Sequence, residues 1–510
     1  MINDKRLHPV MFAGTGSDVG KSIVATAFCR IFLQDGYHPA PFKAQNMALN
    51  SFATPEGLEI GRAQAVQAEA AGIPCHTDMN PLLLKPQSDH TSQVVLNGKP
   101  IGSKDAYDYW KRGEGRGKSS TGIDYRKEVC AAFNRLAARY NPIVMEGAGS
   151  ISEINLRDTD LVNLPMARYA GADVILVGDI DRGGVFASVY GSIALQTPED
   201  RALIKGIIIN KFRGDMRLFD SGRRMLEDIC GIPVLGVIPY YKDIHIEEED
   251  SVTLAQKSMV AEQGKVNVAV IMLQHMSNYT DFDALEQDSR IHLFYTNNVN
   301  DIKKADIIIL PGTKSTLHDL YELRRNGCAQ AIISVARAGT TVLGICGGYQ
   351  MMGMEVCDPD HVEGDISRLP GLGLLPVTTT LSGEKVTRQV TATLSPLTSH
   401  PSPLIKGYEI HMGKTLPFGD AKPSPLAVLD DGREDGYVVS PQCMGTYLHG
   451  ILDNAPFVDF LLQPFAEKLN ENRQSFDYAA YKEKQYDLLA DHVRRYVDME
   501  KVYEILTRNS

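Results

Sequence analysis

The sequence predicts an α/β protein with two doubly wound halves. Short apolar runs alternate with helical stretches in both halves, the first run ends in a glycine-rich loop, and a strand, a sharp turn and a helix surround Cys346. Continuous apolar runs of this length are typical of parallel strands that helices bury on both faces. Their alternation with helices therefore predicts two largely parallel sheets.

The first half begins with a short apolar strand, His8–Ala13, and the apolar spacing that follows predicts a helix over Ser22–Leu33. Each later apolar run ends at a turn-forming or polar residue, as buried strands do. The further predicted strands of this half are Pro142–Met145, Val174–Val177, Ile204–Ile209 and Val234–Ile238.

The acidic stretch Ile246–Asp250 separates the two halves, and a second α/β series begins after it. Its predicted strands are Val266–Leu273, Ile307–Leu310 and Thr341–Ile345, followed by a turn and strand at Leu369–Val377. After about Asn454 the chain is charged and helical. We therefore expect a first domain over residues 1–245, a second over 251–455 and a helical extension over 456–510.

The composition excludes several classes of protein. The chain has 510 residues, 43% hydrophobic and 23% charged, which predicts several globular domains. The net charge of −11 argues against a general nucleic-acid binder but allows a local basic groove. No apolar run reaches the ~20 residues that a membrane span needs, and we expect no signal peptide. The eight cysteines form no CxxC pair. We expect a cytoplasmic protein with no membrane or nucleic-acid partner; an oligomer is compatible with the sequence.

The glycine-rich loop lies between a strand and a helix, the context that a phosphate-binding loop requires. Backbone N–H groups of such a loop bind phosphate oxygens, Lys21 reaches the outer phosphates, and the Ser22 hydroxyl is a ligand for Mg²⁺. The alternative is a generic strand-to-helix turn. The predicted ATP-binding residues are Thr15, Gly16, Asp18, Val19, Gly20, Lys21 and Ser22.

The loop departs from the standard pattern, which has glycine where Thr15 stands. It resembles the variant of dethiobiotin synthetase and its relatives. The partition and septum-site ATPases of that superfamily carry an extra lysine early in the loop, and Gly16 stands at the equivalent position here. The resemblance therefore implies a dethiobiotin-synthetase-like sheet rather than a dimeric nucleotide switch.

Two residues at strand ends support nucleotide chemistry. Glu146 follows an apolar strand, where a carboxylate holds Mg²⁺ opposite a phosphate loop; the alternative is an acid at a helix N-terminus. Asn210 follows the strand Ile204–Ile209. In the ATPases that the loop resembles, an asparagine here faces the adenine; the alternative is a polar strand end.

Cys346 lies at the predicted strand–turn–helix, flanked by Gly344, Gly347 and Gly348. Such a turn imposes strained dihedral angles on its central residue and exposes that side chain above the sheet. The N-terminus of the following helix favours a thiolate and supplies N–H groups, including that of Gly347, to an oxyanion. Cys346 is therefore the predicted nucleophile, with His449 as the candidate base. Taken alone, such a histidine is more often structural.

This pattern resembles the class I glutamine amidotransferase domain, in which a cysteine thiolate attacks the glutamine side-chain amide and releases ammonia. The resemblance implies that Gly312, which follows the strand Ile307–Leu310, belongs to the oxyanion loop. Members of that class carry a glutamate two residues after the histidine, whereas Ile451 stands here. The third member of a triad stays unassigned from the sequence.

Nearly the whole chain resembles the cobyric acid synthase family, the corrinoid amidotransferases of cobalamin synthesis. The matching stretches include residues 41–51, 59–69, 78–86, 146–150, 153–157, 179–186, 210–215 and 407–413. The resemblance implies ATP- and glutamine-dependent amidation of the b, d, e and g carboxylates of adenosylcobyrinic acid a,c-diamide through acyl phosphates, with ATP and Mg²⁺ bound. The alternatives are a cobyrinic acid a,c-diamide synthase, another carboxylate amidotransferase, or a nucleotide switch with a vestigial amidotransferase domain.

The implied substrate is a polyanion, so we expect cations near it. Lys43 and Arg182 lie in matched segments and are the predicted contacts to phosphate or corrinoid. For either residue, the alternative is a solvated surface cation.

Overall fold

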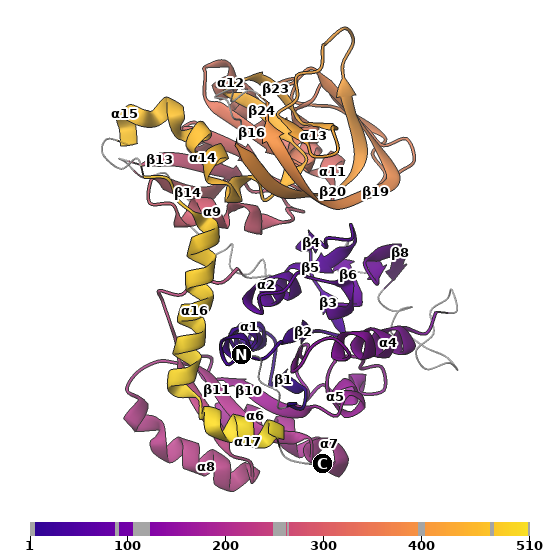
Figure 1. The fold of residues 1–510 in the computed structure, drawn as a ribbon. Helices are drawn as coiled ribbons and strands as arrows, with labels where there is room; N and C mark the ends of the chain where they lie inside the picture. The colour runs from indigo at the N-terminus through magenta and orange to yellow at the C-terminus, as the bar shows by residue number, and fades with distance from the viewer. Residues whose placement is uncertain are drawn as a thin grey trace. The chain divides into compact units, whose positions relative to one another are not determined.

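The computed structural model describes residues 6–86, 91–105, 123–247, 262, 265–395, 403–469 and 474–507. The chain forms two compact units (Figure 1). The first unit contains residues 1–48, 58–247 and 481–510, and the second contains residues 49–57 and 248–480. The predicted helical extension over 456–510 is therefore divided between the units at Ala480 and Tyr481 instead of forming a part of its own.

The first unit is built on a six-stranded, wholly parallel sheet in the order β12-β11-β10-β1-β9-β2. Every residue of β1 and β10 is buried, as the continuous apolar runs predict. The predicted α/β class is confirmed. Along the chain the strands are β1 (Val10–Gly14), β2 (Ala40–Phe42), β9 (Ile143–Glu146), β10 (Asp173–Asp179), β11 (Ile204–Phe212) and β12 (Val234–Pro239).

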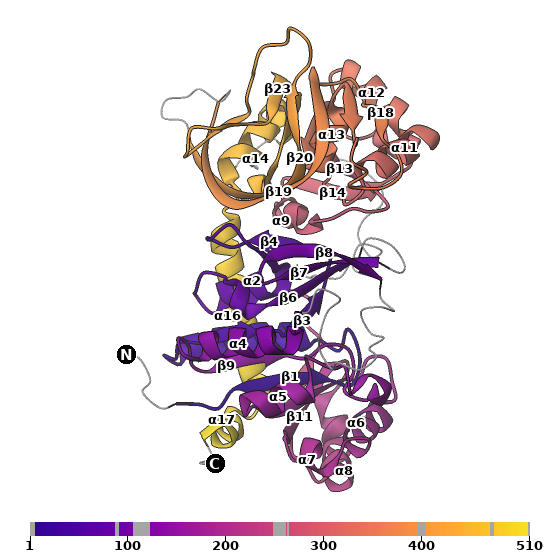
Figure 2. The same cartoon turned by 90° about the vertical axis from the view of Figure 1, so that its right-hand side faces the viewer.

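Helices cover both faces of this sheet; in Figure 1, α1 lies on one side of β1, and α4 and α5 lie on the other (Figures 1 and 2). Helix α1 follows the phosphate loop and packs on β1 and β9. The helices of this unit are α1 (Lys21–Gln34), α2 (Arg62–Ala70), α4 (Tyr125–Ala137), α5 (Leu164–Ala170), α6 (Val185–Ala194), α7 (Pro198–Arg201) and α8 (Asp220–Cys230).

A small second sheet in this unit, not predicted from the sequence, has the order β3-β6-β7-β8. Its pairs β6–β7 and β7–β8 are antiparallel, and β7 is half-buried over its first three residues and buried over its last three. Its strands are β3 (Gln45–Met47), β6 (Leu82–Pro86), β7 (Thr91–Leu96) and β8 (Lys99–Asp105).

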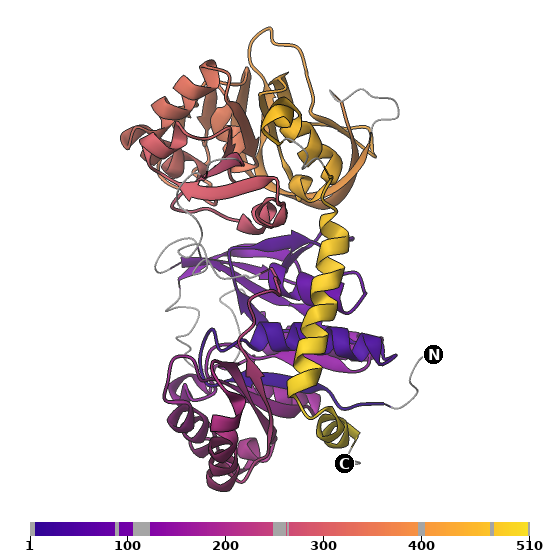
Figure 3. The ribbon, with the colours of Figure 1, turned by 90° about the vertical axis from the view of Figure 1, so that its left-hand side faces the viewer.

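The C-terminal helices return to the first unit. Most of α16 (Tyr478–Tyr496) and all of α17 (Met499–Thr507) belong to it; they are the yellow helices of Figure 3. The backbone N–H of Asp498 donates to the carbonyl of Leu235 at 2.8 Å, and Val497 forms a bridge with Gly236 of β12. None of the described helices is long and apolar enough to cross a membrane.

The second unit contains a six-stranded sheet in the order β14-β13-β15-β16-β24-β23, parallel except for the edge pair β23–β24. Its strands are β13 (Val266–Ile271), β14 (Ile291–Thr296), β15 (Ile307–Leu310), β16 (Thr341–Ile345), β23 (Tyr437–Ser440) and β24 (Cys443–Thr446). Its helices are α9 (Asp283–Gln287), α10 (Val299–Ile302), α11 (Thr316–Arg325), α12 (Cys328–Arg337), α13 (Gly347–Met352), α14 (Ala455–Leu462) and α15 (Ala466–Leu469).

A largely antiparallel sheet that the sequence analysis did not predict accompanies it. Its centre is the long, curved pair β19 (Val377–Leu394) and β20 (Leu404–Pro417), orange in Figure 2. The threonine-rich β19 alternates buried and exposed residues near its ends, which suits a sheet with one solvated face. The other strands are β17 (Glu355–Cys357), β18 (Arg368–Pro370), β21 (Ala427–Leu429), β22 (Glu434–Asp435) and β25 (Leu448–His449).

Candidate active sites

The predicted phosphate loop joins β1 to α1. The ammonium of Lys21 donates to the carbonyls of Gly16 at 2.8 Å and Gly149 at 2.9 Å. Gly20 has φ +94°, and a Cβ there would lie 2.1 Å from the Asn210 amide nitrogen, so only glycine fits this close approach. The Asn210 amide in turn donates to the carbonyl of Val19 at 3.0 Å.

Two further predicted loop residues, Thr15 and Asp18, contact side chains from other segments. The Ser150 hydroxyl donates to the carbonyl of Thr15 at 2.9 Å, and these two residues form a backbone bridge. Asp18 has φ +55° and its carboxylate accepts from Arg182 at 3.3 Å. The Arg182 side chain is 66% exposed, so this contact is a weak one at the surface.

Glu146, at the end of β9, is the centre of a buried polar cluster. Its Oε1 accepts from the Ser22 hydroxyl at 2.8 Å and from the Lys43 ammonium at 2.7 Å, and its Oε2 accepts from the Gln67 amide at 2.6 Å. Burial alone would raise the pKa of Glu146. The Lys43 charge and the hydrogen bonds from Lys43, Gln67 and Ser22 outweigh it and hold the pKa below its usual value, so the carboxylate is ionised.

The pair of Ser22 and Glu146 fits a magnesium ion. Hydroxyl and carboxylate oxygens are the hard donors that Mg²⁺ prefers, and here they are in contact beside the phosphate loop. The carboxylate is only 1% exposed and ionised, so a cation is needed beside it; Lys43 supplies one in this structure.

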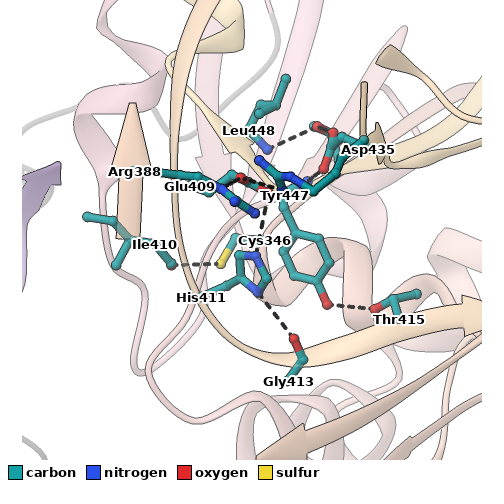
Figure 4. Close-up of polar contacts among 12 residues, drawn as sticks. Cys346, Arg388, Glu409, Ile410, His411, Gly413, Thr415, Asp435, Tyr447 and Leu448 are labelled. Carbon is teal, nitrogen blue, oxygen red and sulfur yellow. Dashed lines mark hydrogen bonds and ion pairs between the residues drawn. The ribbon is translucent and has the colours of Figure 1, made fainter. Parts of the chain in front are cut away.

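Cys346 occupies the strained turn that the sequence predicts, with φ +53° and ψ −110°. Close packing explains the flanking glycines: a Cβ on Gly348 would lie 1.9 Å from the carbonyl oxygen of Leu310, and one on Gly344 would lie 2.7 Å from the backbone of Tyr349. The turn points the sulfur toward β20, where it lies 3.6 Å from the carbonyl oxygen of Ile410 (Figure 4).

His449 is held by a carboxylate that the sequence analysis did not find. Its Nδ1 lies 2.6 Å from Oδ2 of Asp281, whose other oxygen accepts from the backbone N–H of Gly450 at 3.1 Å. Burial lowers the pKa of His449, but the charges of Asp281 and Cys346 and their hydrogen bonds raise it to about 10. The three side chains form a Cys–His–Asp arrangement with an imidazolium beside the sulfur.

The two predicted oxyanion residues lie beside this arrangement. A Cβ on Gly312 would be 3.2 Å from Cε1 of His449 and 3.6 Å from Cβ of Cys346. Gly347 begins α13, and a Cβ there would lie 3.1 Å from the backbone nitrogen of Thr313. The segment after β15 and the start of α13 therefore approach each other closely at the sulfur.

The buried carboxylate of Asp319 contacts the segment that follows β15. Asp319 Oδ2 accepts from the Thr313 hydroxyl and from the backbone N–H of His275 at 3.2 Å, and its Oδ1 lies 2.9 Å from Nδ1 of His275. The Asp319 hydrogen bond is the largest cause of a raised pKa at His275. These contacts hold Thr313, the residue after Gly312, next to the backbone of His275.

Comparisons with known proteins support both halves of the interpretation. Residues 10–254 match a family model described as "CobQ/CobB/MinD/ParA nucleotide binding domain", and residues 267–457 match a "CobB/CobQ-like glutamine amidotransferase domain". A "Cobyric acid synthase" of Bacteroides fragilis is 71% identical over 99% of this chain and 100% of its own length. The chain belongs to the cobyric acid synthase family.

More distant members of the cobyric acid synthase family match over the same length. The protein of Phocaeicola vulgatus is 67% identical over 99% of both chains, and that of Citrobacter koseri is 44% identical over 98% of both. Among solved structures, a glutamine amidotransferase is 17% identical, with a TM-score of 0.29 over 40% of this chain and 98% of that one. That likeness is too weak to carry an argument.

The domain matches correspond to the two clusters of side chains. The Lys21 and Glu146 cluster lies within the nucleotide-binding match, and Cys346 and His449 lie within the amidotransferase match. The sequence analysis missed Asp281, although its segment Thr280-Asp281-Phe282-Asp283 places two acids soon after the first strand of the second half. The position of these two acids was the sequence feature that could have indicated Asp281.

His411 lies beside Cys346 in Figure 4 without belonging to the Cys346–His449–Asp281 arrangement. Its ring stacks on Tyr447 at 3.8 Å between centroids, and its Nε2 lies 3.7 Å from Glu409 (Figure 4). Glu409 also pairs with Arg388. The ring is thus held between an aromatic face and an ion-paired carboxylate.

Proposed function

We propose that the chain amidates the b, d, e and g carboxylates of adenosylcobyrinic acid a,c-diamide, using glutamine as nitrogen donor and ATP as phosphoryl donor. The identity of 71% to a cobyric acid synthase over the full length of both proteins is the observation that carries this proposal. The two clusters of side chains supply the two halves of the chemistry, one in each unit.

The second unit releases ammonia from glutamine. The Cys346 thiolate attacks the side-chain amide carbon, and the N–H groups of Gly312 and Gly347 stabilise the negative oxygen of the tetrahedral intermediate. His449, protonated and held by Asp281, gives its proton to the departing nitrogen, so ammonia leaves and a thioester remains on Cys346. Water then hydrolyses the thioester, which frees glutamate and restores the thiolate and the imidazolium.

The first unit activates the carboxylate, a poor electrophile because its leaving group would be oxide. The backbone N–H groups of residues 15–20 and the Lys21 ammonium bind the phosphates of ATP. Asn210 positions the loop through Val19. Ser22 and Glu146 would hold Mg²⁺, which neutralises developing charge when bound. Lys43 and Arg182 provide further positive charge beside the transferred phosphoryl group.

The amidation step needs only the substrate carboxylate, ATP and the released ammonia. The substrate carboxylate oxygen takes the γ-phosphoryl group, giving an acyl phosphate and ADP. Ammonia attacks the acyl carbon, inorganic phosphate leaves, and the nitrogen loses a proton to give the neutral amide. One ATP and one glutamine are consumed for each of the four carboxylates.

The decisive experiment is a mass-spectrometric count of amidations with adenosylcobyrinic acid a,c-diamide, glutamine, ATP and Mg²⁺. Each amidation replaces a hydroxyl with an amino group, so the steps can be counted. We expect four additions. A product without additions, from protein that still hydrolyses glutamine and ATP, would refute the proposed substrate.

The variant Cys346→Ser separates the nitrogen donor from the rest of the chemistry. We expect it to lose glutamine-dependent amidation and to keep amidation from added ammonium salt, because the first unit is unchanged. Full glutamine use by Cys346→Ser would refute the assignment of the nucleophile.

A further inference from the structure

The first unit has a pocket beside the phosphate loop. Its volume is about 940 Å³, counting the space at its open mouth. One wall is β3, another is the segment after β9, and the third begins with the short helix η2 (Ile154–Leu156). We name it the acceptor pocket and define it by six of its lining residues: Gln45, Met47, Gly149, Ser150, Ile154 and Leu156.

The floor of the acceptor pocket touches one end of the phosphate loop. Ser150 donates to the carbonyl of Thr15, and the carbonyl of Gly149 accepts from Lys21. Asn210 contacts the other end of the loop, at Val19. A triphosphate with its outer phosphate at Lys21 therefore presents its reactive end toward Gly149 and Ser150.

The mouth of the acceptor pocket has three exposed apolar side chains beside the charged Glu153 and Arg157. Met47, Ile154 and Leu156 are 55%, 47% and 37% exposed. Three large apolar side chains that converge on one pocket mark a ligand contact more strongly than the same residues scattered over the surface. The pocket therefore combines apolar side chains at its mouth with a polar floor.

Side-chain hydrogen bonds to the backbone hold the walls of the acceptor pocket in place. The side chain of Asn163 accepts from the backbone N–H of Ala148 at 3.1 Å and donates to its carbonyl at 3.0 Å. The amide of Gln196, which is buried, donates to the carbonyl of Ile151 at 2.8 Å. The segment between β9 and η2 is thus shaped before any ligand arrives, which lowers the entropy cost of binding.

We infer that the acceptor pocket binds the corrinoid: one peripheral carboxylate enters toward Ser150 and Lys21, while Met47, Ile154 and Leu156 pack against the apolar edge of the macrocycle. This inference rests on the proposed function. Because the stated volume includes open space at the mouth, we expect one side chain and the neighbouring ring edge to enter and most of the macrocycle to stay outside.

The apolar side chains at the mouth suit a substrate that must be presented in four orientations. Hydrophobic contact is non-directional, so it is retained when the ring turns to bring another carboxylate to the loop. A methionine adapts its shape to each orientation because its side chain is unbranched and flexible. Directional hydrogen bonds to the ring edge would instead favour one carboxylate over the other three.

The test measures corrinoid binding to Ile154→Asn and Met47→Ser by equilibrium dialysis of adenosylcobyrinic acid a,c-diamide, followed by its visible absorption. We expect Kd, and the KM for the corrinoid, to rise about tenfold for Ile154→Asn, since half an isoleucine side chain loses its apolar contact. The KM values for ATP and glutamine should stay unchanged. The matched control is Ile229→Asn on α8, where the isoleucine is 54% exposed and lies outside the pocket.

The possible outcomes separate a failure of the acceptor pocket from a failure of the proposed function. Normal corrinoid affinity in both pocket variants, or an equal loss in Ile229→Asn, would overturn the acceptor pocket. A wild-type protein that binds ATP and hydrolyses glutamine but binds no corrinoid would instead overturn the proposed function. Weak binding by the pocket variants alone, with four amidations by the wild type, supports both.

Discussion

At the scale of single residues, the buried pair of Asp281 and His449 sets the chemistry of the amidotransferase unit. The two side chains are 168 positions apart in the chain and 2.6 Å apart in space. Both are almost completely buried, so the carboxylate stabilises the imidazolium strongly and fixes which ring nitrogen faces the sulfur.

We expect Asp281→Asn to lower glutamine hydrolysis by roughly a hundredfold, because the amide neither stabilises the imidazolium nor fixes the ring tautomer. Amidation from ammonium salt should be unchanged. Rates with the two nitrogen sources, measured on one preparation, check this. Equal losses with both sources would show that the variant damages the whole protein, and an unchanged glutamine rate would remove Asp281 from the catalytic arrangement.

The same pair predicts a dependence of stability on pH. The pKa of His449 is raised to about 10, above an unfolded value near ~6.5. Protonation of His449 therefore stabilises the second unit fully below about pH 6.5, and this contribution is lost as the pH rises through about 10. In Asp281→Asn the raised pKa falls, so the loss should end at a lower pH and should be smaller in total. Melting temperatures of both proteins between pH 6 and 10 test this, and parallel curves would contradict it.

Site residues that require particular neighbours in the chain could be predicted from the sequence. Site residues that depend on contacts between distant segments could not. Cys346 and Lys21 were predicted from the turn and loop that carry them, since each needs neighbouring glycines for its backbone path. Asp281 has no such local requirement. Its role comes from tertiary packing that brings η5 (Tyr279–Phe282) to Gly450, and the two acids in this segment do not identify that partner in a single sequence.

At the scale of elements, the turn between β16 and α13 depends on glycines, because there is no room for side chains at their positions. Gly348 lies so close to the end of β15 that a Cβ on it would overlap the Leu310 carbonyl. Because β15 is paired on both sides, with β13 and β16, that carbonyl cannot move away at low cost. The same strand end leads directly into Gly312, so distortion there reaches the oxyanion segment.

We expect Gly348→Ala to destabilise the second unit by about 3 kcal/mol and to reduce glutamine hydrolysis in the folded fraction, because the added methyl group overpacks a rigid backbone. The control is Gly383→Ala in β19, where a Cβ would have no heavy atom within 4 Å. Its unfolding free energy should change by less than about 0.5 kcal/mol. Denaturant unfolding of both variants measures this, and equal stabilities would contradict the close approach.

The two sheets with antiparallel strands were not predicted from the sequence. The strands of the two parallel sheets were found because burial on both faces leaves continuous apolar runs. Strand β19 carries threonines, charged residues and a glycine, and its pairing with β20 depends on partners more than twenty residues away in places. Such strands are specified by cross-strand contacts, which a reading of local pattern does not contain.

At the scale of the whole molecule, the chain leaves the first unit near Glu247 and returns to it at Tyr481. The sequence predicted the C-terminal helices but not their destination, because an apolar helix face does not identify the surface it covers. In the structure Tyr503 of α17 stacks on Tyr37 and packs edge-on against Phe32 of α1, with ring centroids 6.1 and 6.0 Å apart. Its hydroxyl donates to Asp35, which also pairs with Arg494.

These contacts make the stability of the nucleotide-binding unit depend on the last segment of the chain. We expect Tyr503→Ala to lower the free energy of unfolding of the first unit by about 3 kcal/mol, through lost aromatic contacts and a lost hydrogen bond. The second unit should unfold as before. On heating, ATP-dependent amidation from ammonium salt should then fail at a lower temperature than in the wild type, while glutamine hydrolysis keeps its thermal limit. The matched control is Tyr190→Ala on α6, where the tyrosine is 50% exposed. A shift in glutamine hydrolysis, or an equal effect of Tyr190→Ala, would contradict the assignment of residues 481–510 to the first unit.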